Sequence, residues 1–327
     1  MISGFGKDTL VLDPRAEVDR IIEILRQQVF GTLRRRGVVV GLSGGIDSSV
    51  VAALSVRAFG KDKVLGIFMP ELHSSGDSLR LGRTVATQLG IDSILEDITP
   101  ALEGIGAYSR QVDAIRTVVP AYGDGWKCKL VMASVLESNG LNITRLTVED
   151  PEGNIDTVRL SPAAYLQIVA ATNYKQRVRK MTEYYHADRL NFAVAGTPNR
   201  LEHDQGFFVK QGDGIADVLP IVHLYKTQVY QLAEYLGIDP EVRSRPPTTD
   251  TFSMAQSQEE FYFALPYHLT DLCLYGVNHG ISAAEVATVA GLTEDQVQKV
   301  FKDIESKRRA ARYLHARPLP VTAMDEG

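Results

Sequence analysis

The chain has 327 residues, of which 44% are hydrophobic, so it can bury a sizeable core as one large domain or a domain with an appendage. Its 35 Lys and Arg and 40 Asp and Glu give a formal net charge of -5, which offers no general attraction for nucleic acid. The two cysteines, Cys128 and Cys273, exclude a disulfide framework and a cysteine zinc site and predict a reducing cytoplasm. We expect neither a membrane-spanning segment nor a signal peptide.

The first third of the chain alternates helices and strands. Apolar residues recur at helical spacing over residues 17–34, and the β-branched residues 38–40 predict a buried strand. A second strand covers 64–69, a helix then runs to Gly90, and a third strand covers 94–98. Strands that alternate with helices predict parallel βαβ units. The expected fold class is therefore α/β, with a doubly wound parallel sheet flanked by helices.

A Ser/Gly-rich turn over residues 41–49 follows the first strand and opens a helix. Its glycines allow a sharp turn that brings backbone N–H groups close to a ligand, and the helix start adds unpaired donors and the positive end of a dipole. These features favour a phosphate group as the ligand. The turn lacks the Lys-Ser/Thr of a Walker loop and the glycine spacing of a dinucleotide-binding motif. A plain strand-to-helix turn, with Ser and Asp as helix caps, is the alternative interpretation.

The middle of the chain is less regular. Helical periodicity lapses around 110–160, and residues 143–148 and 157–160 alternate apolar and polar side chains on either side of a Pro/Gly turn, which predicts an inserted β-hairpin. Further along the chain, the pattern predicts a helix from Pro162 to about His186, a strand over 191–195 and a helix over 224–236. We expect a single domain over 1–327, in which residues 255–327 form C-terminal helices.

The turn sequence Ser-Gly-Gly-x-Asp-Ser at 43–48 resembles the pyrophosphate loop of the N-type ATP pyrophosphatases. Those enzymes split ATP into AMP and pyrophosphate in order to activate an oxygen for replacement. Three later segments, 196–202, 210–217 and 224–226, make the resemblance specific, because they look like the motifs of NAD synthetases. That family forms an amide, converting nicotinate adenine dinucleotide (deamido-NAD) to NAD. The matching stretches follow the family's order and cover about half of the chain.

The resemblance implies which residues hold ATP and magnesium. It assigns Asp47 and Glu202 to Mg²⁺, an ion that prefers hard oxygen ligands and takes one or two carboxylates beside phosphate oxygens. The residues that it implies for ATP are Gly41, Leu42, Ser43, Gly44, Gly45, Ile46, Asp47, Ser48, Thr197, Lys226 and Thr248. Taken singly, Asp47 could be a first-turn helix residue favoured by the dipole, and Glu202 could be a solvated surface residue.

The resemblance also implies which residues hold the dinucleotide. Arg177 and Lys210 would bind its pyrophosphate and carboxylate as cations with directed donors, and Asp217 would accept ribose hydroxyls. Lys210 joins Asp47 and Glu202 in the implied catalytic set. Arg177 lies in a cationic helical stretch that could equally be an ordinary solvated face, and a single lysine is more often a surface residue.

Two stretches depart from the family pattern. The segment around 115–160 is longer than in compact members, and it precedes the helix that presents Arg177, so it could reshape the pocket over the acid. At the C-terminus the family usually has a basic pair shortly before a proline pair. Here the basic run 307–309 is followed by the longer stretch 313–320. The sequence therefore does not identify which basic residue would reach the substrate.

Residues 281–297 read like a helix-turn-helix with capping-box spacings at both helix starts. The second helix begins with Glu294 and Asp295, which are unsuited to meeting phosphates. We therefore expect no nucleic-acid partner, and we expect these helices to pack as a lid or brace.

The expected activity is ATP-dependent amidation of deamido-NAD with ammonia. An oxygen of the acid attacks the α-phosphorus, pyrophosphate leaves, and ammonia attacks the acyl-adenylate to release AMP. The resemblance implies a homodimer. A separate glutaminase subunit could supply the ammonia, since neither cysteine lies in a nucleophile motif. The alternatives are an amide synthetase acting on another carboxylate and a non-catalytic nucleotide-binding regulator.

Overall fold

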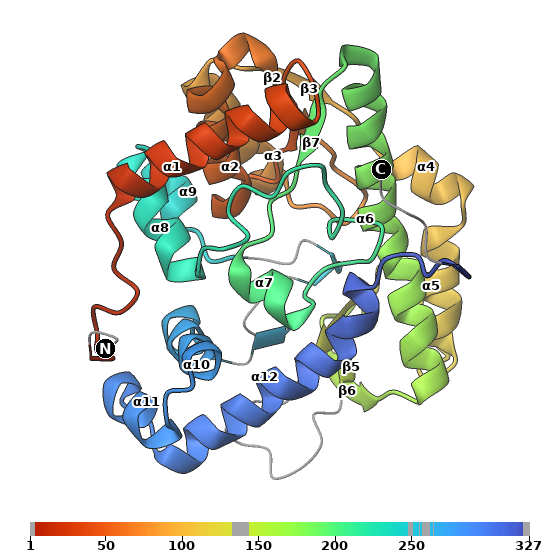
Figure 1. Cartoon of the computed structure of the whole chain (residues 1–327). Helices are drawn as coiled ribbons and strands as arrows, with labels where there is room; N and C mark the ends of the chain where they lie inside the picture. The colour runs from red at the N-terminus through yellow and green to blue at the C-terminus, as the bar shows by residue number, and fades with distance from the viewer. Residues whose placement is uncertain are drawn as a thin grey trace.

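The computed structural model describes residues 4–132, 144–247, 251–254, 256, 262–263 and 265–322. Figure 1 shows parallel strands enclosed by helices in its upper half and a group of C-terminal helices below them. Two predicted positions, Ile143 of the hairpin and Thr248 of the ATP contacts, lie outside the described residues.

Four parallel strands form the central sheet, in the order β3-β2-β1-β7. They are β1 (Val38–Gly41), β2 (Val64–Phe68), β3 (Asp92–Leu95) and β7 (Ala193–Ala195). β1 lies between its neighbours, and its first residue pairs with the first residues of both β2 and β7. The α/β class with a doubly wound parallel sheet is confirmed. The third strand begins and ends earlier than the 94–98 that the sequence predicted.

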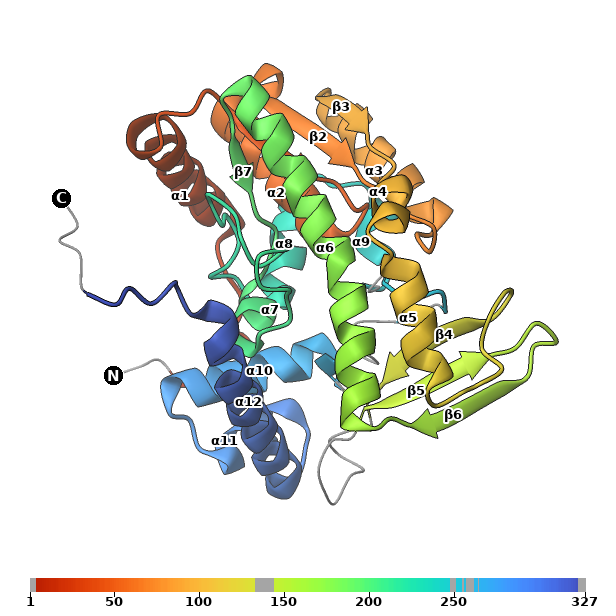
Figure 2. The same cartoon turned by 90° about the vertical axis from the view of Figure 1, so that its right-hand side faces the viewer.

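Helices cover both faces of this sheet. α1 (Pro14–Arg26), α2 (Ile46–Phe59), α3 (Gly76–Leu89) and α8 (Lys226–Tyr235) pack on one face, and α6 (Pro162–Leu190) covers the other. Figure 2 shows α6 running the length of the molecule across the strands. Because helices enclose the sheet on both sides, β1, β2 and β7 are almost wholly buried, which explains their continuous apolar sequences.

The helix boundaries follow local capping. Ser161 accepts a hydrogen bond from the backbone N–H of Ala164, and Pro162 takes the first position of α6, as the sequence predicted. The helix predicted over 17–34 begins earlier and has two parts. α1 begins directly after its N-cap Asp13, and a π-helical segment (Gln27–Thr32) follows it. A 3-10 turn (Lys61–Lys63) leads into β2.

The insertion forms a small antiparallel sheet with the order β4-β5-β6. Its strands are β4 (Lys127–Val131), β5 (Arg145–Glu149) and β6 (Ile155–Arg159), so the predicted hairpin is confirmed and gains a third strand that the sequence did not indicate. The sheet packs against α5 (Ala107–Arg116) and the first turns of α6. A short helix, α4 (Thr99–Gly104), precedes α5. Figure 2 places the sheet at the N-terminal end of α6.

The C-terminal part is helical, as expected. It consists of α10 (Tyr267–His279), α11 (Ala283–Ala290) and α12 (Glu294–His315), which share their own apolar core. Both predicted capping boxes are present, at the starts of α11 and α12. Two short helices, α7 (Arg200–Gln205) and α9 (Pro240–Ser244), lie between β7 and this group. Among the helices described, none combines the length and apolarity needed to cross a membrane.

A buried ion pair joins the loop after β2 to α6. Lys175 Nζ lies 2.9 Å from Glu71 Oε1 and 3.0 Å from His73 Nδ1, and it donates to the Thr251 carbonyl at 2.8 Å. The hydroxyl of Tyr108, on α5, donates to Glu71 Oε2 at 2.8 Å. Both charged side chains are almost completely buried. The pair thus holds two separate loop segments against α6.

We predict that Glu71→Gln lowers the free energy of unfolding by roughly 3–5 kcal/mol, because it leaves the buried Lys175 ammonium without its counter-charge. Urea unfolding at neutral pH measures this loss. Glu149→Gln is the matched control, since the side chains of the Lys127–Glu149 pair are 52% and 25% exposed and a pair in contact with solvent should be worth at most about 1 kcal/mol.

The effect of Glu71→Gln should depend on pH. Burial acts to raise the pKa of Glu71, but the Lys175 ammonium and the hydrogen bonds from Lys175 and Tyr108 bring that pKa below its ordinary value of 4.5. A carboxyl with a lowered pKa stabilises the fold above 4.5 and loses this contribution as the pH falls through its folded-state pKa. A difference between wild type and Glu71→Gln that stayed constant on acidification would contradict this account.

Candidate active site

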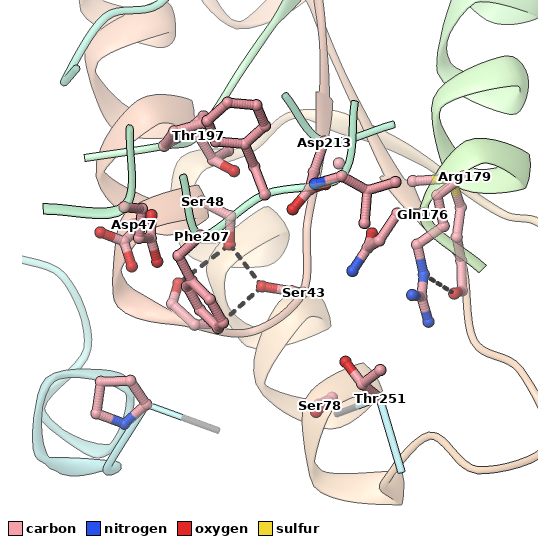
Figure 3. A pocket seen from close by; sticks show the side chains of 18 of the residues that line it. Ser43, Asp47, Ser48, Ser78, Gln176, Arg179, Thr197, Phe207, Asp213 and Thr251 are labelled. Atoms are coloured by element: carbon pink, nitrogen blue, oxygen red, sulfur yellow. Dashed lines mark hydrogen bonds between the residues drawn. The ribbon is translucent and has the colours of Figure 1, made fainter. Parts of the chain in front are cut away.

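The loop between β1 and α2 is held by its own hydroxyl groups. Ser43 Oγ lies 3.2 Å from Ser48 Oγ, and the hydroxyls of Ser48 and Ser49 donate to the Gly45 carbonyl at 3.1 and 2.8 Å. Figure 3 shows the first two of these serines facing the cavity. No side chain in the described ranges caps the start of α2, so its N-terminal amides remain suited to an anionic ligand.

Two carboxylates lie beside this loop. Asp47 is in the first turn of α2, and Glu202 is in the first turn of α7. Asn199 connects them: its Nδ2 donates to Asp47 Oδ1 at 3.1 Å, and its backbone N–H donates to Glu202 Oε2 at 3.2 Å. Burial, followed by the negative charge of Asp47, raises the pKa of Glu202 to about 8. The structure therefore brings together the two carboxylates that the resemblance assigned to magnesium.

A buried ammonium completes this corner. Lys226, the first residue of α8, is fully buried, and its Nζ donates to Asp47 Oδ2. Although burial acts to lower it, the charges of Asp47 and Glu202 raise the pKa of Lys226, so this side chain stays charged. The ring of Tyr267 lies beneath the ammonium, with its centroid 5.4 Å from Nζ. Asp47, Glu202 and Lys226 are called the charged corner below.

A cavity of about 560 Å³ opens beside the charged corner, at the carboxyl ends of the parallel strands. Gly41, Met69 and Gly196 line it where β1, β2 and β7 end. Residues from other parts of the chain also line it: Leu130, Met132, Thr144, Tyr165, Val169 and Phe252. Leu130 lies on β4, and Met132 and Thr144 flank the strands β4 and β5, so the insertion shapes the cavity.

One stripe of α6 also lines the cavity, and it was not foreseen. Its members recur at helical spacing: Thr172, Asn173, Gln176, Arg179, Lys180 and Glu183. Figure 3 shows Gln176 and Arg179 on this side, and Arg179 Nε donates to the Met69 carbonyl at 3.2 Å. The 3.6-residue period could have identified this stripe, because Arg179 lies in the same basic stretch as Arg177 but on a different face.

Two further residues near the cavity carry charge. Asp213 faces the cavity, its Oδ1 accepts the Val209 backbone N–H at 2.7 Å, and burial raises its pKa. Arg245 donates to Ser75 Oγ at 3.2 Å and to Ser78 Oγ at 3.3 Å. Asp213 lies within the 210–217 stretch used for the resemblance, and Arg245 lies three residues before the implied Thr248, but neither was assigned a role.

The residues implied for the dinucleotide lie outside the cavity lining. Arg177 is exposed, and its Nε donates to the Lys210 carbonyl at 3.3 Å. Lys210 Nζ donates to the carbonyls of Tyr313 and Ala316 at 2.7 and 3.0 Å. Asp217 Oδ2 accepts the backbone N–H of Val194, in β7, at 2.7 Å. Their roles stay predictions.

Most of the residues implied for ATP, unlike those implied for the dinucleotide, line the cavity. Gly41, Leu42, Ser43, Gly45, Ile46, Asp47, Ser48 and Thr197 line the cavity. Lys226 reaches the same corner through Asp47. Gly44 makes the turn itself, with a φ of +74°. Thr248 lies outside the described residues.

These features define a class of protein: an α/β fold with a Ser/Gly-rich loop suited to an anion at the end of β1 and a carboxylate pair beside that loop. The sequence matches the NAD synthase family over residues 17–119 and 129–312. The chain belongs to this family.

Individual relatives agree. An NH(3)-dependent NAD(+) synthetase of Mesorhizobium japonicum is 83% identical over 310 residues, covering 95% of this chain and 97% of the relative. One of Rhizobium meliloti is 58% identical over 322 residues, covering 98% and 96%.

Solved structures share the fold. The NMN synthetase of Francisella tularensis has a TM-score of 0.64 at 21% identity, covering 94% of this chain and 98% of that one. The NH3-dependent NAD synthetase of Campylobacter jejuni, in complex with the nitrate ion, has a TM-score of 0.62 at 19% identity, covering 95% and 100%.

We predict that Gly44→Ala disrupts the loop. A Cβ atom at this position would lie 2.4 Å from the Ser78 carbonyl oxygen and 3.0 Å from the Gly82 backbone nitrogen. The positive φ alone costs roughly 1–2 kcal/mol for alanine, and the clash adds to that cost. Urea unfolding should show a lower free energy of unfolding, and titration with pyrophosphate should show weaker binding.

Gly280→Ala is the matched control for this substitution. Gly280 has a φ of +66°, but a Cβ at that position would have no atom of a described residue within 4 Å, apart from its own local backbone and chain neighbours. It should therefore incur only the backbone cost and leave pyrophosphate binding unchanged. Equal effects of the two substitutions on binding would contradict the account of the loop.

Proposed function

We propose that this chain catalyses the ATP-dependent amidation of nicotinate adenine dinucleotide to NAD with ammonia, releasing AMP and pyrophosphate. The observation that carries the proposal is the charged corner, in which Asp47 of the pyrophosphate-loop motif meets Glu202 of the 196–202 motif and Lys226. The proposal is also supported by the printed name of the Mesorhizobium japonicum relative, NH(3)-dependent NAD(+) synthetase.

Magnesium is part of this proposal, and the residues present fit it. Asp47 and Glu202 would hold the ion. Burial, followed by repulsion from Asp47, raises the pKa of Glu202, and a divalent cation would relieve that repulsion. In the described ranges, no group of three or more His, Cys, Asp or Glu side chains could hold a metal ion, so the remaining ligands would be phosphate oxygens and water. When bound, magnesium would withdraw charge from the phosphates.

The chain's own contribution to the chemistry is positioning and neutralisation of charge. A carboxylate oxygen of the acid forms a bond to the α-phosphorus of ATP, and the bond to the bridging oxygen breaks, releasing pyrophosphate. The Ser43–Ser48 loop, with the N-terminus of α2, would receive that leaving group. The nitrogen of ammonia then bonds to the acyl carbon, AMP leaves with the original carboxylate oxygen, and the nitrogen loses a proton.

Ammonia, rather than glutamine, is the proposed nitrogen donor of this chain. Both cysteines are buried, and burial raises the pKa of the Cys128 thiol and raises that of Cys273 to about 12. A thiol nucleophile requires the opposite shift and access to substrate. A separate glutaminase subunit, supplying ammonia to this chain, is compatible with this arrangement.

We further propose that the whole chain acts as one unit, that it works as a homodimer, and that it resides in the cytoplasm. The buried, unpaired cysteines support a reducing compartment. Met181 and Tyr185, one turn apart on α6, are each 63% exposed and would be covered by a second copy. Light scattering of the purified chain measures the oligomeric state.

We predict that Asp47→Asn and Glu202→Gln each lower the rate of AMP formation by about 100-fold or more, because each removes a ligand charge at the phosphates without removing volume. The assay follows AMP released from ATP in the presence of deamido-NAD and ammonium. Circular dichroism establishes that both variants are folded.

Glu103→Gln is the control for these variants, since Glu103 is an exposed residue of α4 that does not line the cavity. It should keep wild-type turnover. Near-normal rates for Asp47→Asn or Glu202→Gln at moderate magnesium concentrations would show that the carboxylates do not hold the ion.

We predict that the purified chain forms NAD from ammonium salts and fails with glutamine alone. The rate at a fixed total ammonium concentration should rise with pH, because deprotonation yields the free ammonia that carries a nucleophilic lone pair. Mass spectrometry of the NAD formed measures both the choice of nitrogen donor and the dependence of the rate on pH. Efficient synthesis from glutamine that Cys128→Ala or Cys273→Ala abolished would overturn this reading of the cysteines.

A further inference from the structure

The C-terminal helices contact both of the short elements that present the charged corner. α10 packs against the start of α8, which carries Lys226, and α12 packs against α7, which carries Glu202. Figure 1 shows α10 and α12 below α7 and α8. The contacts involve specific charged groups, which lie away from the cavity lining.

Asp271 of α10 caps the start of α8 from a distant part of the sequence. The backbone N–H of Thr227 donates to Asp271 Oδ2 at 2.7 Å, and Asp271 is fully buried. The side chain of Tyr225, at the N-cap position, makes no capping hydrogen bond. A carboxylate is the favoured partner for the first amides of a helix, because it meets their partial positive charge. Asp271 therefore fixes the helical turn from which Lys226 extends.

A second residue of α10 acts on the same turn. Tyr267 lies one helical turn before Asp271, and its ring is the one beneath the Lys226 ammonium, at 5.4 Å. Residues four apart share a helix face, so a single face of α10 contacts both the backbone and the charged end of this turn.

Arg308 of α12 makes the corresponding contact with α7. Its Nε and Nη2 donate to Asp204 Oδ1 and Oδ2 at 2.6 and 2.8 Å, a bidentate pair. Asp204 lies two residues after Glu202 in the same short helix. Arg308 Nη2 also donates to Asn278 Oδ1, and Asn278 Nδ2 donates to the hydroxyl of Tyr225 at 3.3 Å. α10, α12, α7 and the start of α8 are thus linked by one set of polar contacts.

We propose that Asp271 and Arg308 are positioning residues, through which the C-terminal helices set the geometry of Lys226 and Glu202. This inference rests on the proposed function, because it assigns the charged corner to magnesium and ATP. Asp271 acts through the start of α8, and Arg308 acts through α7. The two contacts therefore affect different measurable quantities: Asp271 the affinity for ATP, and Arg308 the requirement for magnesium.

The experiment compares the full chain with Asp271→Leu, Asp271→Asn, Arg308→Leu and Arg308→Lys. Steady-state kinetics give kcat, the KM for ATP and the magnesium concentration for half-maximal rate, and urea unfolding gives stability. Lys299→Ala is the control, since it removes a charge from α12 that pairs with Asp295 near the surface. Each variant is assayed at a temperature well below its unfolding transition.

Asp271→Leu should raise the KM for ATP by roughly 2- to 30-fold, the range that corresponds to the loss of a helix cap. Asp271→Asn should restore most of the affinity, because its amide oxygen still accepts the Thr227 N–H. Arg308→Leu should raise the magnesium requirement by roughly 10-fold or more, as for residues that orient a metal ligand. Arg308→Lys should restore it only in part, because an ammonium cannot make both bonds to Asp204.

Unchanged KM and magnesium requirement in folded Asp271→Leu and Arg308→Leu would overturn the proposal, as would the same shifts in Lys299→Ala. If Asp271→Leu does not fold, the two Arg308 variants decide the matter by the same criteria. A wild-type chain that forms no AMP would instead refute the proposed function. The positioning roles would then be decided by titrating the same variants with Mg²⁺-ATP alone, where equal affinities would overturn them.

Discussion

The contact between the buried Lys226 ammonium and the Asp47 carboxylate organises the site. It joins α2, in the first half of the chain, to α8, in the second, at the point where the strands of the parallel sheet end. A fully buried ammonium is stable only with a counter-charge, so the two helices are held at one relative position. Burial and the charge of Asp47 raise the pKa of the nearby Glu202 to about 8, so the ionised form of Glu202 calls for a further positive charge, as the proposed magnesium ion would supply.

The rest of the fold supports this contact from three sides. β1 and β7 are neighbours in the sheet, which places the Ser-Gly-Gly loop beside the start of α7. Residues of the inserted sheet and a stripe of α6 line the cavity beside this contact. Asp271 of α10 caps α8 and Arg308 of α12 holds α7, so the C-terminal helices serve as a brace in the proposed scheme. Both residues lie outside the segment 281–297 that resembled a helix-turn-helix.

The sequence predicted what depends on local patterns. The parallel strands, the loop, the capping boxes and the hairpin all carry signals within a few residues, and the resemblance brought Asp47 and Glu202 together across the chain. β4 was missed because residues 132–144 separate it from β5, a connection longer than the loops of about two to five residues by which hairpins are identified. The contacts of Asp271 and Arg308 depend on how distant helices pack against one another. Patterns within a single sequence do not reveal such contacts. The roles of Arg177, Lys210 and Asp217 remain predictions.

The most direct test of the account follows an oxygen atom. If a carboxylate oxygen of nicotinate adenine dinucleotide attacks the α-phosphorus of ATP, that oxygen must leave with AMP when ammonia displaces it. The acid is labelled with ¹⁸O in its carboxylate, and the products are analysed by mass spectrometry. AMP should carry one labelled oxygen and pyrophosphate none. Unlabelled AMP, or label in pyrophosphate or inorganic phosphate, would contradict this mechanism.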